Sequence, residues 1–116
     1  MINVLTIMNN ELEKMNIPYT FDEWDGEIKL PQWIGEISEV PTYDEDGKSE
    51  YSFILTGYAT SYTYLFEVAD ELKKKYKLSQ IIDRVVIKYN DVKTVDNGTE
   101  DLKQIEVNMT IKEWSV

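Results

Sequence analysis

The residues that most resemble a reaction or metal centre are the carboxylates of Asp44, Glu45 and Asp46, which precede Gly47. Closely spaced carboxylates followed by glycine are typical of calcium-binding loops, but the EF-hand needs glycine at its sixth position and an oxygen ligand at its fifth. Counted from Asp44, glycine stands fourth and Lys48 stands fifth. We therefore expect no metal site here and interpret the segment as an acidic connection between two strands.

Other catalytic chemistry has little support in the side chains present. The 116 residues include no histidine and no cysteine, which excludes thiolate nucleophiles, disulfides and zinc sites built from these residues. The 22 acidic residues allow many carboxylate pairs, but no spacing singles out one pair for glycoside chemistry. No spacing favours a Ser–Lys nucleophile, and no glycine-rich phosphate loop is present. We expect no catalytic residue, no cofactor and no small-molecule substrate.

The charge of the chain is unevenly distributed. Residues 20–50 contain ten acidic and two basic residues, so they hold −8 of the net charge of −10. A negative field repels phosphate backbones, so specific nucleic-acid binding is not expected. The acidic stretch serves solubility or attracts a basic partner.

A basic run in the second half of the chain complements this acidic stretch. Lys73, Lys74 and Lys75 end a predicted helix, where lysines commonly face water and offset the helix dipole. They also suit the acidic stretch of a neighbouring copy. We expect copies to associate head to tail, which closes into a ring if the rotation between them permits.

Aromatic residues flank the acidic stretch and admit two interpretations. Tryptophan and tyrosine anchor protein interfaces, but they also fill cores. For Trp24, Trp33 and Tyr43 both interpretations stay open. The candidate interface residues are Trp24, Trp33, Tyr43, Asp44, Glu45, Asp46, Lys73, Lys74 and Lys75.

Two helices are predicted from apolar residues spaced three and four apart. The first spans residues 4–15, with Glu11 among the polar residues between its apolar ones, and ends before Pro18. The second begins after a cap at Thr60 or Ser61 and has an apolar stripe through residues 65–76. These helices must pack on a sheet.

Strands are predicted at 19–24, 28–40, 51–58 and 82–89, with a last strand at 105–111 that alternates cleanly. Gly57 marks a bulge or a close backbone approach. We predict one α+β domain spanning 1–116, with a mixed or mostly antiparallel sheet of four to five strands, two helices packed on it and a long acidic β-hairpin. No apolar run is long enough to span a bilayer, and no signal peptide is recognisable.

The order of these elements is similar to that of a known family. A helix precedes Ile17-Pro18-Tyr19-Thr20-Phe21, a long hairpin returns through residues 51–58, and a helix at 64–72 leads to two strands that end at Trp114. This order resembles the small tail-terminator and tail-completion (head–tail joining) proteins of long-tailed bacteriophages and prophages. The resemblance implies a structural virion protein, not an enzyme, made in the host cytoplasm and located at the tail or the head–tail junction.

The same resemblance implies partners. Family members form rings, typically hexamers, that contact other tail and head-connector proteins, and DNA passes through the ring without specific binding. An acidic channel lining would suit that passage, because like charges repel. Two alternatives remain: an acidic module of the immunity-protein or inhibitor type that captures a basic partner through residues 20–50, and, ranked last, a small enzyme that uses carboxylates.

Overall fold

Two helices and six strands make up the described part of the chain. A computed structural model describes residues 2–21, 30–40, 48–78, 80–82, 84–98 and 101–114. Within these residues, neither helix is long and apolar enough to cross a lipid bilayer. In chain order the elements are α1 (Ile2–Lys14), β1 (Tyr19–Phe21), β2 (Gln32–Val40), β3 (Lys48–Ala59), α2 (Tyr62–Tyr76), β4 (Gln80–Ile82), β5 (Val85–Thr94) and β6 (Lys103–Trp114).

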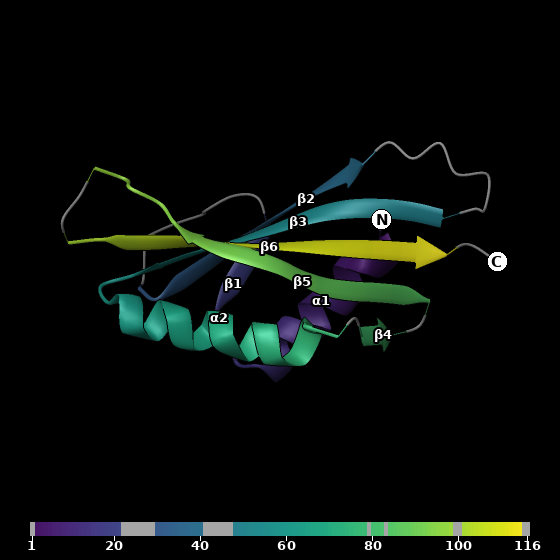
Figure 1. Ribbon diagram of the computed structural model, residues 1–116, viewed down its shortest axis with the longest axis horizontal. Helices are drawn as coiled ribbons and strands as arrows, with labels where there is room; N and C mark the ends of the chain where they lie inside the picture. The colour runs from purple at the N-terminus through teal and green to yellow at the C-terminus, as the bar shows by residue number, and fades with distance from the viewer. Residues whose placement is uncertain are drawn as a thin grey trace.

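All six strands join one curled sheet in the order β1-β2-β3-β6-β5-β4 (Figure 1). Only β1 and β2 run parallel, and every other neighbouring pair is antiparallel. Four long strands form the body of the sheet, and the three-residue strands β1 and β4 lie at its two edges. The predicted α+β class, with two helices and a mixed, mostly antiparallel sheet, is confirmed.

The two faces of the sheet differ because side chains alternate along each strand. In β3, Tyr51, Phe53 and Leu55 are buried, whereas Ser52 and Ile54 between them are half-buried. The predicted alternation of β6 is confirmed in the same way, with its apolar residues buried. We call the buried side the inner face and the opposite side the outer face.

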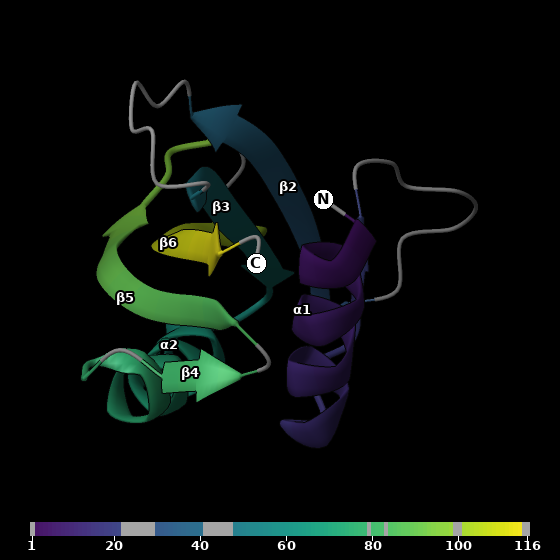
Figure 2. The same ribbon diagram turned by 90° about the vertical axis from the view of Figure 1, so that its right-hand side faces the viewer.

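Both helices pack against the inner face (Figure 2). The buried side chains of α1, including Val4, Met8 and Leu12, belong to the same core cluster as Leu65 and Leu72 of α2. The Ser61 side chain accepts a hydrogen bond from the Thr63 N–H at 3.2 Å, which confirms one of the two caps predicted for α2. Two amphipathic helices therefore cover one side of a single sheet.

The prediction of one continuous strand over 82–89 is wrong. Residues 80–82 form β4, which pairs antiparallel with the start of β5, with Ile82 opposite Val85. Arg84 lies between them with a φ of 68°, in the left-handed region that reverses a chain tightly. Because neither glycine nor asparagine marks this turn, the apolar residues on its two sides read as one strand in the sequence.

Candidate functional site

The predicted interface residues do not form one site. Trp24, Tyr43, Asp44, Glu45 and Asp46 lie outside the described residues. The remaining candidates lie in two places, with Trp33 in β2 and the three lysines Lys73, Lys74 and Lys75 in the last turn of α2.

Trp33 is a core residue, which decides between the two interpretations left open for it and removes it from the interface candidates. Its side chain is fully buried on the inner face, and its Nε1–H donates to the Tyr64 hydroxyl at 3.3 Å. The indole lies over Gly57, which is opposite Trp33 in β3; a Cβ atom at Gly57 would be 2.4 Å from the ring. Gly57 therefore allows a close approach, which is one of the two roles predicted for it. The charged residues near Trp33 in the sequence said nothing about which face its side chain would occupy.

The lysines at the end of α2 divide into two groups. Lys73 and Lys74 are exposed, as a basic helix end facing water requires. Lys75 is half-buried, and its Nζ lies 3.1 Å from Oε1 of Glu11 in α1. Lys75 is therefore engaged within its own chain, and Lys73 and Lys74 remain as the exposed part of the predicted basic patch.

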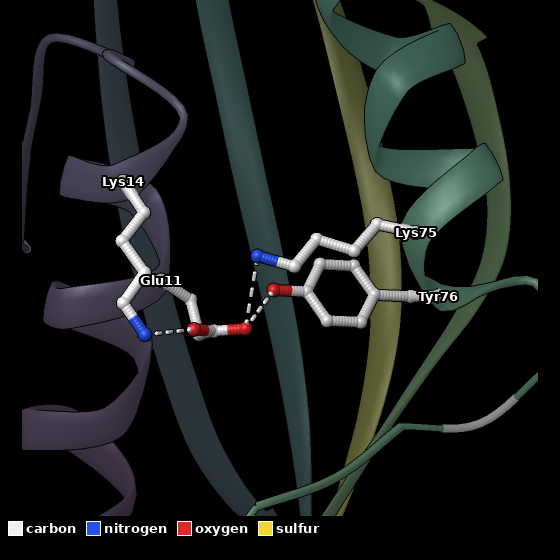
Figure 3. Close-up of polar contacts among 4 residues, drawn as sticks. All are labelled: Glu11, Lys14, Lys75 and Tyr76. Atoms are coloured by element: carbon white, nitrogen blue, oxygen red, sulfur yellow. Dashed lines mark hydrogen bonds and ion pairs between the residues drawn. The ribbon is translucent and has the colours of Figure 1, made fainter.

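Among the described residues, the most densely bonded group of charged side chains lies between the two helices (Figure 3). We call Glu11, Lys14, Lys75 and Tyr76 the Glu11 cluster. The Glu11 residue is only 4% exposed, and its Oε1 accepts a hydrogen bond from the Tyr76 hydroxyl at 2.7 Å, beside the Lys75 contact. Lys14 Nζ lies 3.3 Å from the other oxygen, Oε2. Both oxygens of a buried carboxylate are thus satisfied, one of them by α2.

The electrostatics of the Glu11 cluster favour an ionised Glu11 and a protonated Tyr76. Burial alone would raise the pKa of Glu11, but the hydrogen bonds from Tyr76, Lys75 and Lys14 and the charge of Lys75 outweigh it, and the pKa lies below its ordinary value. Burial, together with the bond to the Glu11 carboxylate, raises the pKa of Tyr76. Near neutral pH Glu11 is ionised and Tyr76 is protonated, so the cluster links α1 to α2 and offers no group ready to exchange a proton.

A second tyrosine, Tyr19 of β1, contacts α1 at Asn9. The Tyr19 hydroxyl donates to Oδ1 of Asn9, and burial together with the charge of Glu13 raises the pKa of Tyr19 to about 12. Tyr19 therefore stays protonated near neutral pH and ties β1 to α1.

The burial of Glu11 was not predicted, since Glu11 was counted only among the polar residues between the apolar ones of the first helix. A signal for its burial was present, since Glu11 follows Met8 by three residues and precedes Met15 by four, within the apolar stripe. An acidic residue in such a stripe needs a buried partner. The partners, Lys75 and Tyr76, lie more than sixty residues further along the chain, and local periodicity does not identify them.

The outer face carries a different polar arrangement. A shallow groove there is lined by residues of β3, β5 and β6: Glu50, Val86, Lys88, Asn90, Thr110 and Lys112. Lys112 Nζ lies 3.8 Å from Glu50 Oε1, and the Asn90 side-chain amide donates to the Thr110 hydroxyl at 2.7 Å. Further along the same face, Lys93 Nζ lies 3.2 Å from Glu106 Oε2. These pairs lie in contact with solvent, so this surface suits docking better than chemistry.

Neither metal binding nor relatedness assigns a function to these sites. Among the described residues, no three histidine, cysteine, aspartate or glutamate side chains lie close enough together to hold a metal ion. A scan of the chain against models of protein families finds no match, and a search among curated proteins finds none with significant similarity. The geometry and charge of the molecule therefore provide the grounds for a function.

Proposed function

We propose that this chain is a structural subunit that acts by self-association, of the tail-terminator or head–tail joining type found in long-tailed phages and prophages. The observation that carries the proposal is the uncovered outer face of the sheet. Both helices pack on the inner face, and no described element covers the outer one. That face nevertheless carries the half-buried apolar side chains of Ile34, Ile54 and Tyr58. Apolar side chains left on an uncovered sheet face are suited to contact with another macromolecule.

The charge distribution supports contact between copies. Residues 20–50 carry most of the negative charge, whereas the end of α2 presents the exposed lysines Lys73 and Lys74. One copy can therefore offer a negative surface to a positive surface of the next. A contact between two different surfaces repeats from copy to copy and closes into a ring where the rotation allows.

The Glu11 cluster supports an assembly role over a catalytic one. Its buried carboxylate is fully hydrogen-bonded, and its tyrosine is held protonated. A general acid or base needs a pKa near the working pH, and neither group has one. By the family resemblance, the ring would be a hexamer that contacts tail and head-connector proteins and lets DNA pass.

Native mass spectrometry and negative-stain electron microscopy across a salt series test the proposal. We expect a ring-sized assembly in dilute salt that dissociates as salt rises, because exposed charge pairs are screened. The double variant Lys73→Gln/Lys74→Gln should weaken it. Glu67→Gln/Asp70→Asn, which neutralises two exposed acids of the same helix, is the matched control.

Two outcomes would contradict ring assembly. A monomer at high protein concentration and low salt would overturn it directly. A monomer that forms a tight one-to-one complex with a basic protein would favour the acidic binding module instead.

A further inference from the structure

In the part of the chain that the structure describes, each edge of the sheet contains a stretch of strand without a paired neighbour. β1 pairs with β2 only at Trp33, Ile34 and Gly35, and β4 pairs with β5 only at residues 85–87. Among the described residues, nothing pairs with the outward edge of β2 over 36–40 or of β5 over 88–94. We call these stretches the β2 open edge and the β5 open edge; they lie toward opposite ends of the long molecule (Figure 1).

The backbone direction shows which groups are available at the β2 open edge. The Trp33 N–H donates to the Pro18 carbonyl at 3.0 Å, so the backbone groups of Trp33 face away from β3. These groups alternate sides along a strand, and the β2–β3 register has no shift. The N–H and C=O groups of Ile37 and Glu39 therefore point outward.

The same alternation applies at the β5 open edge. The Val95 N–H donates to the Gln104 carbonyl at 2.9 Å, toward β6. The one register shift in β5 lies between Tyr89 and Asp91, before this part of the strand. The backbone groups of Val92 and Thr94 consequently point away from β6. A row of unpaired backbone groups is a template for a strand from another chain.

The two open edges carry opposite charge. The β2 open edge has two exposed acids, Glu36 and Glu39, and no base, for a net charge of −2. The β5 open edge has Lys88, Asp91 and Lys93, for a net charge of +1, and Lys93 stays 63% exposed in its ion pair with Glu106. Opposite charges on neighbouring strands favour pairing, and like charges disfavour it. Two β2 open edges would repel each other, whereas a β2 edge and a β5 edge attract.

We infer that the β2 open edge of one copy pairs with the β5 open edge of the next, which continues the sheet across the contact between copies. The inference deepens the proposed function and rests on it, because it adds a contact between strand edges to the charge contact proposed for Lys73 and Lys74. Each copy presents one edge of each kind, so every contact leaves both partners with one edge still available. The chain of contacts then ends only by closing on itself.

Charge reversal with rescue by mixing tests this pairing. Glu36→Lys/Glu39→Lys makes both edges positive, and Lys88→Glu/Lys93→Glu makes both edges negative. Each variant alone should assemble at least about tenfold more weakly than the unaltered chain, because its edges repel. An equimolar mixture should recover assembly with the two variants alternating, measured by native mass spectrometry with one variant isotopically labelled.

A second pair of variants tests the backbone contact at the β2 open edge. Glu39→Pro removes an outward N–H, and proline is tolerated where a strand's N–H faces solvent. Glu39→Gln removes the charge but keeps the N–H. Assembly should be weaker for Glu39→Pro than for Glu39→Gln. Circular dichroism and thermal melting should show a folded protein in every case, since the altered side chains are exposed.

The outcomes separate this inference from the proposed function. If the unaltered chain assembles and the edge variants assemble equally well, edge pairing is overturned and self-association stands. Single variants that fail to assemble and are not rescued by mixing also overturn the pairing of β2 with β5. A chain that stays monomeric under all conditions overturns both proposals and leaves the edge charges as protection against aggregation.

Discussion

The inner and outer faces of the sheet are built by the same strands, but they serve different purposes. On β3, Phe53 and Leu55 are fully buried beneath the helices, whereas Ile54 between them is half-buried and uncovered by a helix. Burial of apolar surface is the main source of folding stability. The inner face therefore supplies most of the stability, and the outer face keeps surface for contact with other molecules.

Charged groups on the two sides of the sheet show the same contrast. Glu11 is buried among hydrogen bonds from both helices, so removing it leaves the Tyr76 hydroxyl without its partner. Lys93 and Glu106 form a pair on the outer face, where water can replace either partner. The contribution of an ion pair to stability depends more on how far its groups are buried than on the distance between its charged atoms.

The sharpest test of the contrast compares two neighbours on β3. Phe53→Ala should destabilise the chain by about 3–5 kcal/mol, because it leaves a cavity in the core. Ile54→Ala should cost less than about 2 kcal/mol, because its side chain is only half-buried. Urea denaturation of the isolated subunit measures both. Equal losses would show that the outer face is packed as tightly as the inner one.

The Glu11 cluster should give the next largest effect. Glu11→Ala should lower the free energy of unfolding by about 2–3 kcal/mol, since a buried hydroxyl loses a charged acceptor. Glu13→Ala, two residues along the same helix but exposed, is the control and should change stability by less than about 0.5 kcal/mol. Similar losses for both would argue against a link between the helices.

Gly57→Ala tests how closely the inner face is packed. The added Cβ atom would lie 2.4 Å from the Trp33 ring, so the indole or the strand must shift. The expected cost is about 1–3 kcal/mol. The double variant Trp33→Phe/Gly57→Ala should lose less than the sum of the two single losses, because the smaller ring makes room. Strict additivity in thermal denaturation would contradict this contact.

The pH dependence of stability tests the charge on Glu11. Because its pKa is lower in the folded protein than its ordinary value of 4.5, the folded state holds the ionised form more strongly than the unfolded state does. This stabilisation is complete above about pH 4.5 and is lost as the pH falls through the folded-state pKa. Glu11→Gln should show a weaker loss over that range in acid titration of unfolding. An unchanged acid profile would assign the loss to other carboxylates.

The smallest effect is expected for the outer-face pair. Lys93→Ala should change the stability of the monomer by less than about 0.5 kcal/mol, because the lysine side chain is 63% exposed and its ion pair with Glu106 is screened by solvent. Added salt should remove even that difference. A loss as large as that of Glu11→Ala would mean that the ion pair on the outer face contributes as much to stability as the buried Glu11 cluster does.

Sequence reasoning succeeded where the pattern is local. The alternation of β6 and the Ser61 cap of α2 follow from neighbouring residues, and both are present in the structure. It failed at Arg84, where an ordinary residue adopts a left-handed turn. It left open the place of Trp33, which lies in the core over Gly57 of another strand. The burial of Glu11 was visible in its stripe, but its partners in α2 were not.

The sequence by itself determined the two helices, most of the strands, the α+β class and the concentration of negative charge in residues 20–50. The helices and strands depend on residue patterns over a few neighbouring positions. The concentration of charge depends on composition alone. Only the tertiary structure decided that Glu11 meets Tyr76, and that β2 and β5 carry edges of opposite charge with which no described strand pairs. Such relations join residues that are far apart in the chain, and they exist only once the elements have packed together.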